Sequence, residues 1–583
     1  MAMEREQESV DETVDEEPEV YASPSEGREY RASAYAPTAY DNLEVAPEDE
    51  EHPDPGTGDS YRLVDLPRVP KLTHVLGPSA IMLGASLGSG ETIFWPLLVA
   101  QNGWSIYWAF WVGVLTHFVI NTEIQRWTLA TGESIFRAFE RVHRAWPVLF
   151  LILGFVSFGW PGWAGTAAKV GATGLGIEST FTLFSYEFLG WKAYGILLML
   201  LIWGSYQLTP LMYNVVERVT AVLVASSVLC AMGLFVLVGD PGELTNIPLG
   251  AVSIGTLPAD EDVAVFLGGL AYAGAGGYLN LSQSLWVREK GYGMGRYQGR
   301  VLNPIVGDEP EIIHRDGFSF EATVENMRRW RGWWRLAQLE HLVTFVLGVL
   351  VTATAMMAIA ATYVTATDAG GVEMWLTGVA PDLSPLAGAL LYGVLFLALF
   401  TTEYAIVESV VRNSADVIYE SVGRERGWSL PRIFWYLLTA FAGWGILILT
   451  LPIPIEQPFG LLLTAAAMSG AMMWPYTALT LLINTRRLPE HTQPGWPRII
   501  AMWWATAFFG YFSVLLVGNT FEQLLGLSVF RVTIGAAGSA PGGLALFVVL
   551  AITQVYVMSA SAKAKWRAEE TVEAAEEADG LFS

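Results

Sequence analysis

The fold is decided by one apolar stretch, residues 77–101, which reads GPSAIMLGASLGSGETIFWPLLVAQ. Its middle holds Gly88-Ser89-Gly90-Glu91, which interrupts an otherwise apolar helical pattern. A second stretch, residues 263–286, has Gly274-Ala275-Gly276-Gly277 at the same place. A bilayer cannot hydrogen-bond a loose backbone, so a helix interrupted at membrane depth is tolerated only where it lines a protein cavity. Paired interruptions in the two halves of a chain indicate the binding site of a secondary transporter.

The composition is that of a membrane protein. The chain has 583 residues, of which 52% are hydrophobic. Many apolar runs are close to twenty residues long, the length that an α-helix needs to cross about 30 Å of hydrocarbon. We therefore predict an all-α polytopic membrane protein with about twelve transmembrane helices. The predicted spans are 76–101, 104–126, 147–171, 189–208, 214–238, 263–286, 340–364, 384–411, 433–453, 458–483, 498–518 and 541–561.

Basic residues are concentrated in alternate loops. The loops 239–262 and 365–383 carry no Lys or Arg, whereas the basic loops are 126–146, 287–338, 412–432 and 484–498. Because basic loops stay in the cytoplasm, we expect a multi-pass protein of the cytoplasmic membrane with both termini cytoplasmic. The acidic, polar N-terminus shows no cleavable signal peptide.

The net charge of −24 is concentrated at the ends of the chain. Residues 1–60 hold 19 Asp or Glu against three Arg. Low apolar content with high charge predicts a disordered acidic cytoplasmic tail over residues 1–65, either solvating or regulatory. Six Lys against 27 Arg, together with acidic external loops, indicate a high-salt, acidic proteome.

The two interrupted spans run in opposite directions, which predicts a 5+5 inverted repeat with broken helices 1 and 6. The repeat would occupy a core over residues 70–485. Within it, the cytoplasmic segment 287–338 contains an Arg- and Trp-rich stretch typical of a helix in the membrane interface. Residues 486–561 would add two transmembrane helices, and residues 562–583 a charged cytoplasmic tail.

Glu91 is the strongest candidate for an ion-binding residue. An ionisable group at membrane depth costs at least about 2.5 kcal/mol unless it is paired or hydrated. A carboxylate near the N-terminus of a half-helix also interacts favourably with the helix dipole. Helix capping is therefore the alternative role for Glu91. Carbonyl groups of Gly88, Ser89 and Gly90 would add hard oxygen ligands.

The second interruption offers neutral oxygen donors from Ala273, Gly276, Gly277 and Asn280. No Met, Cys or His lies at either break, Gly88-Ser89-Gly90-Glu91 or Gly274-Ala275-Gly276-Gly277. Carboxylate and carbonyl oxygens suit magnesium, manganese or calcium, so a hard metal cation held by Glu91 and Asn280 is favoured over a soft one.

Other polar residues lie within the predicted spans. Thr401, Thr402 and Glu403 are coupling-ion candidates, although Glu403 could equally pair with a buried Arg or a backbone donor. His117 is either a satisfied packing residue or part of a proton relay. Pro161 predicts a kink in its span.

Several function classes are excluded. Cys230 is the only cysteine, so the chain has no internal disulfide and no thiolate metal cluster. It lacks a nucleic-acid module, a zinc-ligand helix and a soluble catalytic domain, so we expect neither an enzyme nor a bound cofactor.

Some motifs resemble those of the Nramp family of divalent-metal transporters, which has the leucine-transporter-type fold. The resemblance covers about residues 70–485. It rests on Gly77-Pro78 with Gly88-Ser-Gly-Glu91, Gly132-Glu133, Gly276-Gly277-Tyr-Leu-Asn280, residues 287–295 and residues 329–334.

The chain also departs from the family pattern. Gly88 stands where the family has the Asp of an Asp-Pro-Gly-Asn motif, and Glu91 stands at the Asn position. The sixth span lacks the family's Met-Pro-His motif. The resemblance therefore implies the fold and ion transport more strongly than iron or manganese specificity or proton coupling.

Together these features predict a secondary transporter that moves a divalent cation, such as magnesium or manganese, by alternating access. The alternative is a sodium-coupled symporter of a small organic solute such as an amino acid or amine, with Thr401 and Thr402 holding sodium.

Overall fold

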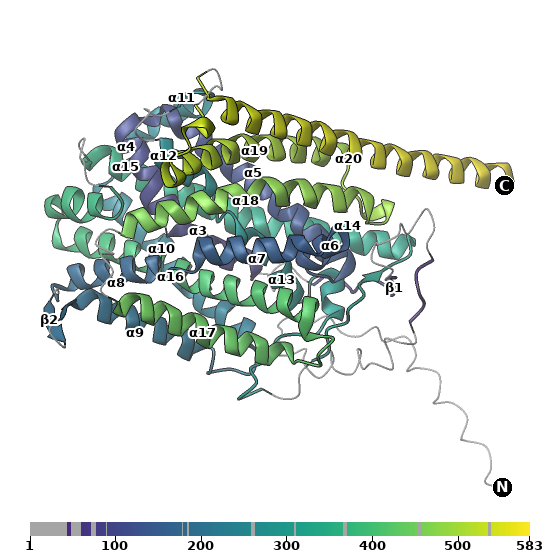
Figure 1. Ribbon diagram of the computed structural model, residues 1–583, viewed down its shortest axis with the longest axis horizontal. Coiled ribbons are helices and arrows are strands. Elements are labelled where there is room, and N and C mark those ends of the chain that lie inside the picture. Colours follow the sequence, from purple (N-terminus) through teal and green to yellow (C-terminus); the bar gives the residue numbers. More distant parts are fainter. Residues whose placement is uncertain are drawn as a thin grey trace, which may run out of the picture.

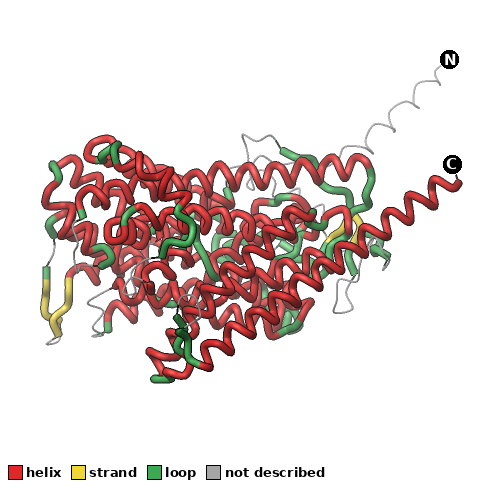
Figure 2. Tube along the Cα trace, turned by 90° about the horizontal axis from the view of Figure 1, so that it is seen from above, coloured by secondary structure: helices red, strands yellow, loops and turns green. Residues whose placement is uncertain are grey.

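The structure is a computed structural model that forms one elongated bundle of helices (Figures 1 and 2). It describes residues 43–47, 60–70, 77–88, 90–177, 179–183, 186–257, 263–307, 311–364, 370–451, 458–533 and 538–582.

The long helices coincide with the predicted spans. They are α5 (Tyr107–Thr131), α7 (Ala145–Phe158), α8 (Gly162–Leu175), α9 (Gly190–Ser205), α10 (Met212–Val238), α15 (Leu347–Tyr363), α16 (Pro385–Ile418), α17 (Leu430–Thr450), α18 (Pro458–Arg486), α19 (Trp496–Leu525) and α20 (Pro541–Phe582). In the described part of the chain, seven helical stretches are long and apolar enough to cross a membrane. The all-α polytopic architecture is therefore confirmed, while the count of twelve spans and the inverted repeat stay predictions.

The first interrupted span has a gentler break than we expected. It consists of α3 (Pro78–Leu87), a π-helical turn η2 (Gly90–Phe94) and α4 (Trp95–Asn102). Ser89 lies outside the described residues. The prediction of an unwound backbone is thus wrong for residues 90–94, because these residues form a π-helical turn.

The second interrupted span is unwound as predicted. Helix α12 (Val263–Ala271) ends six residues before α13 (Tyr278–Lys290) begins. Between them Gly274 has φ 111°, and Ala275 has φ 56°. A left-handed backbone at a residue with a Cβ costs on the order of 1–3 kcal/mol and persists only where the surroundings impose it, often at functional sites.

A third interruption separates α7 from α8 at residues 159–161. The kink predicted at Pro161 is therefore a full break, and Pro161 stands immediately before the first residue of α8. This break leaves the first N–H groups of α8 free for another element to bind.

The Arg- and Trp-rich segment is not a separate interfacial helix. Helix α14 (Val324–Glu340) continues through the π-turn η7 (His341–Val346) directly into α15. Trp330 and Trp333 are buried inside the protein, and the Trp333 indole Nε1 donates to the Pro67 carbonyl at 2.8 Å. These tryptophans pack α14 onto the protein instead of anchoring it to lipid.

Part of the expected N-terminal tail is folded against the bundle. Strand β1 (Arg62–Leu63) pairs in parallel with β4 (Phe318–Ser319), and Tyr61 is only 1% exposed. The prediction of a disordered tail up to residue 65 is therefore wrong for residues 43–47 and 60–65. The sequence also gave no signal for the hairpin of β2 (Thr180–Leu183) and β3 (Tyr186–Leu189).

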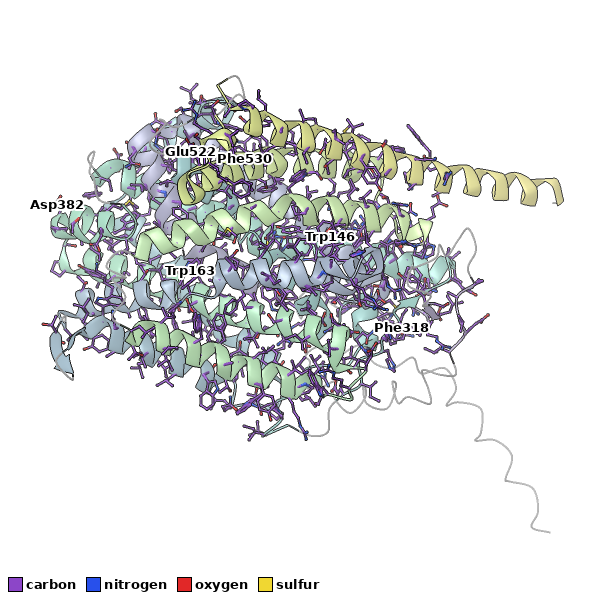
Figure 3. The ribbon with its side chains drawn as sticks, in the orientation of Figure 1. Trp146, Trp163, Phe318, Asp382, Glu522 and Phe530 are labelled. Atoms are coloured by element: carbon purple, nitrogen blue, oxygen red, sulfur yellow. The ribbon has the colours of Figure 1, made fainter. Side chains whose placement is uncertain are left out.

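Alternate loops gather at opposite ends of the bundle. Strand β1, helix α6 (Ile135–Val142) and the end of α20 lie at one end, whereas α11 (Ile247–Val252) and β2 lie at the other (Figure 1). Figure 3 likewise shows Phe318 and Asp382 at opposite ends. The basic loops and the loops without Lys or Arg are therefore separated along the bundle axis, as the predicted topology requires.

Candidate functional site

The two interrupted helices meet inside the bundle. A Cβ atom added at Gly90 would overlap the carbonyl oxygen of Tyr272, so the two backbones touch there. The Phe94 ring stacks on the Tyr272 ring with 6.2 Å between centroids, and the Trp95 indole Nε1 donates to the Gly269 carbonyl at 3.0 Å. Glycine at position 90 is required because any side chain would separate the two segments.

Glu91 is placed at this junction. Its side chain is fully buried, and neither carboxylate oxygen has a hydrogen-bond partner in the described residues. The backbone N–H of Gly274 lies near the carboxylate, which sets Glu91 against the second interruption. A buried carboxylate without a partner is strongly unfavourable unless it meets a cation or takes up a proton.

Thr402 explains why the first helix is interrupted. Its hydroxyl donates to the Gly84 carbonyl at 2.9 Å and accepts from the Gly88 N–H, also at 2.9 Å. In a regular helix that N–H would bond the Gly84 carbonyl directly, so the hydroxyl has inserted into the ladder of hydrogen bonds. The Gly88 carbonyl, predicted as an ion ligand, accepts from the Thr92 hydroxyl at 3.2 Å.

The neighbouring residues on α16 are also occupied. The Thr401 hydroxyl donates to the Leu397 carbonyl of its own helix at 2.6 Å. The Glu403 carboxylate accepts from the Ala164 N–H at 3.1 Å, and its second oxygen has no partner among the described residues. Glu403 therefore binds the first turn of α8, next to the buried Trp163, which Figure 3 shows within the bundle. This contact agrees with the backbone-partner alternative for Glu403.

Asn280 belongs to a different set of contacts from Glu91. The Asn280 amide donates to the Asn121 side-chain carbonyl at 2.6 Å and lies 3.1 Å from His117 Nδ1. No hydrogen bond joins Glu91 to Asn280 in the part of the chain that the structure describes. Among the described residues the Asn280 Oδ1 is nevertheless buried without a hydrogen-bond partner.

The contacts of Asn121 continue to residues that the sequence interpretation missed. Asn121 Nδ2 lies 3.1 Å from His341 Nε2, and His341 Nδ1 lies 2.8 Å from the Ser79 hydroxyl. The Ser79 backbone N–H then donates to Glu340 at 3.1 Å. The sequence did hold a signal for these residues. Glu340 and His341 are ionisable residues at the start of an apolar run, which marks them as candidate site residues.

The backbone of the second interruption is closely packed. Ala273 is fully buried, and a Cβ atom at Gly277 would strike Ser469 of α18. The same construction at Gly276 would place a Cβ atom 3.0 Å from the Met473 sulfur. A thioether therefore lies beside the second interruption, although Gly274-Ala275-Gly276-Gly277 itself contains no methionine. The sequence could not show this because Met473 is nearly 200 residues away along the chain.

Any cation at this junction would meet few charged ligands. Among the described residues no group of three or more His, Cys, Asp or Glu side chains is placed to hold a metal ion. The polar groups that the structure brings together there are the Glu91 carboxylate and the backbone of the second interruption. Such a set suits a cation that keeps part of its hydration shell.

One end of the bundle is joined by buried ion pairs. Arg412 of α16 pairs with Glu408 and with Glu289 of α13, the latter at 3.0 Å, and Arg288 pairs with Asp416 at 2.9 Å. Glu408 is fully buried, and Arg412 and the Tyr206 hydroxyl bind its carboxylate. These pairs tie the inner half of the second interrupted helix to α16.

Solved structures with the same architecture are manganese transporters. A mutant of the Eremococcus coleocola manganese transporter matches 86% of this chain and 97% of its own, with a TM-score of 0.57 at 9% identity. The same transporter in complex with an aromatic bis-isothiourea substituted compound matches 88% and 99%, with a TM-score of 0.57 at 10% identity. The chain has the fold of these transporters.

The expected Nramp-like architecture is therefore confirmed at the level of the fold. At 9–10% identity the likeness concerns the course of the backbone and not the residues of the site. No protein-family model matches the chain. No curated protein matches it either.

Proposed function

We propose that this protein is a secondary transporter that moves a divalent metal cation across the cytoplasmic membrane by alternating access. The observation that carries the proposal is the Glu91 carboxylate, buried without a partner where two interrupted helices meet. A positive ion is one ligand that would offset the burial of such a carboxylate, and a proton is the other. The named function of the solved structures with this fold, manganese transport, supports the same class of cargo.

The donor set favours a hard cation such as magnesium or manganese. Glu91 supplies one negative charge, and the Asn280 Oδ1 with the carbonyls near Ala273, Gly276 and Gly277 supplies neutral oxygens. Magnesium is commonly bound through one or two carboxylates while it keeps several waters. The Met473 sulfur is a soft donor beside these oxygens, but it adds little to the binding of a hard ion.

In this proposal the interrupted helices are the moving parts. The core of residues 70–485 would contain two inverted repeats that rock around the site and open it to one side of the membrane at a time. The pairs of Arg412 with Glu408 and Glu289 would hold the inner half of α13 when the site is closed on that side. Both termini would lie in the cytoplasm, as the basic loops predict.

The alternative, a sodium-coupled symporter of a small organic solute, would use Thr401 and Thr402 to hold sodium. Both hydroxyls already have partners, Leu397 for Thr401 and the Gly84 and Gly88 backbone for Thr402. A sodium ion there would have to break those bonds. The geometry therefore favours the cation at Glu91.

Uptake by the purified protein in proteoliposomes tests the proposal. Vesicles would be challenged with Mg²⁺, Mn²⁺ and Ca²⁺, and separately with radiolabelled amino acids under an inward sodium gradient. The proposal predicts divalent-ion uptake that needs no organic solute. Amino acid uptake that requires sodium, without transport of any divalent ion, would establish the symporter instead.

A further inference from the structure

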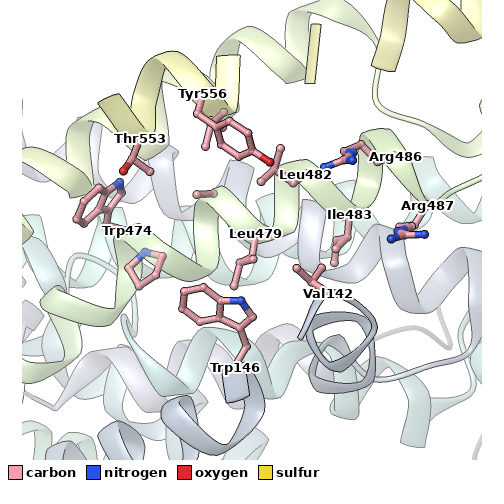
Figure 4. Close-up of a pocket in the computed structure, with 13 residues that line it drawn as sticks. Val142, Trp146, Trp474, Leu479, Leu482, Ile483, Arg486, Arg487, Thr553 and Tyr556 are labelled. Carbon is pink, nitrogen blue, oxygen red and sulfur yellow. The ribbon is translucent and has the colours of Figure 1, made fainter. Parts of the chain in front are cut away.

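A groove of about 440 Å³ opens between α18 and α20 (Figure 4). Its floor is the apolar face of α18, including Leu479 and Leu482, and Val142 and Trp146 form the opposite wall. Tyr556 of α20 covers it from the other side. An apolar groove between helices that face lipid is shaped for a hydrocarbon chain.

The groove has the length of one membrane leaflet. Its lining on α18 begins at Trp474 and ends with Arg486 and Arg487, where that helix stops. The thirteen residues from Trp474 to Arg486 rise about 18 Å along an α-helix. The hydrocarbon core is about 30 Å thick, so the groove runs from one interface to slightly beyond the bilayer midplane.

The charged end of the groove is the one expected at the cytoplasmic surface. Arg486 is exposed, and it forms no hydrogen bond or ion pair within the described residues. Glu569, the first acid along α20, is engaged by the Trp496 indole at 3.0 Å and by Lys565 at 3.8 Å. The Arg486 guanidinium is thus free to bind an anion at the depth of the lipid headgroups.

We propose that this groove is a binding site for an anionic phospholipid of the inner leaflet. The acyl chain lies along α18 between Trp146 and Tyr556, and the phosphate contacts Arg486. Basic pockets between transmembrane helices on the cytoplasmic side bind anionic headgroups in this way. A free phosphate would use only the charged end and leave the apolar length of the groove exposed to solvent. The site is independent of the cargo, so it stands whether or not the protein carries a metal.

Native mass spectrometry of the full-length protein, delipidated in detergent, tests this assignment. The protein is titrated with dioleoylphosphatidylglycerol, with dioleoylphosphatidylcholine and with inorganic phosphate. We expect retained phosphatidylglycerol adducts, weaker phosphatidylcholine adducts and no effect of inorganic phosphate. Arg486→Ala should lower the affinity for phosphatidylglycerol about fivefold, the contribution expected of one arginine at an anionic membrane surface.

Two further variants separate the contribution of the Arg486 charge to lipid binding from that of the apolar groove. Arg432→Ala removes an exposed arginine from the first turn of α17, outside the groove, and should leave lipid binding unchanged. Leu482→Trp fills the groove with an indole, and because Leu482 is only half-buried the bundle can accept it. This variant should lose both lipid adducts.

Three results would overturn the proposal. The first is equal binding of the two lipids by the wild type with no effect of Arg486→Ala. The second is a stabilisation by inorganic phosphate as large as that by phosphatidylglycerol, which would mean a simple anion site. The third is a dimer that Leu482→Trp dissociates while lipid binding is unaffected, which would make the groove a contact between two copies of this chain.

Discussion

Gly90 touches the carbonyl oxygen of Tyr272, and this contact joins the two interrupted helices at their closest point. The contact leaves no space for a methyl group. It also holds Glu91, the next residue, at the junction.

Gly90→Ala should therefore push the interrupted helices apart. Forcing an extra methyl group into a packed interior typically costs about 1–3 kcal/mol, and the displaced Glu91 would also lose its position. We expect a lower melting temperature together with weaker ion uptake. Gly443→Ala is the matched control, because Gly443 lies on exposed α17 with nothing near its Cβ position. That variant should be unchanged or stabilised by up to about 1 kcal/mol, and equal behaviour of the two variants would contradict the close contact.

Thr402 offers a second prediction because its hydroxyl fills the gap between Gly84 and Gly88. Thr402→Val leaves both buried backbone groups unpaired, at about 1–3 kcal/mol for an unsatisfied group. Thr402→Ser should restore most of the lost stability, since it returns the hydroxyl. Thr401→Val should be nearly neutral, because the Thr401 hydroxyl only bonds its own helix. Chemical unfolding in detergent measures all three, and a loss for Thr401→Val as large as that for Thr402→Val would refute this role.

We expect Glu403 to stabilise the first turn of α8 and not to bind a coupling ion. Glu403→Gln keeps a side-chain oxygen that can accept from the Ala164 N–H, so both folding and uptake should survive. Glu403→Ala removes the acceptor and should lower stability by about 1 kcal/mol, as the loss of a helix cap does. Uptake that is abolished in Glu403→Gln while the protein remains folded would show instead that the charge itself is needed.

Met473 tests whether the cargo is a hard ion. Met473→Leu conserves volume, so its stability should fall by less than about 1.5 kcal/mol. Because magnesium and manganese prefer oxygen ligands, their uptake should be almost unaffected. A selective loss of manganese uptake with magnesium uptake intact would mean that the thioether takes part in ion selection.

The course of the helices could be predicted from the sequence because it depends on local patterns. Apolar runs gave the spans, and the glycines around residues 274–277 gave the unwound segment that separates α12 from α13. Glycine accepts the left-handed backbone that this segment needs, so its presence there is informative. The basic loops likewise anticipated the separation of the two ends of the bundle.

The contacts of the site could not be predicted, because they join residues far apart in the chain. The helix at Gly88 is opened by Thr402, more than 300 residues later, and nothing near Gly88 indicates such a partner. Asn280 was expected beside Glu91, but its amide is bound by Asn121 and lies next to His117. The sequence interpretation also failed to predict that residues 60–65 pack against the protein. The acidic composition of the tail favoured disorder, although Tyr61 is buried.

The central claim is that Glu91 binds the transported cation, and uptake by Glu91→Gln tests it most directly. Wild type, Glu91→Gln and Glu325→Gln would be reconstituted side by side, Glu325 being an exposed carboxylate of α14. Equal insertion and melting temperature would establish that all three are folded. The account predicts that Glu91→Gln lowers initial Mg²⁺ or Mn²⁺ uptake at least about tenfold, the effect of losing one charged interaction of about 1.5 kcal/mol or more, while Glu325→Gln transports normally. Wild-type uptake by folded Glu91→Gln would contradict it.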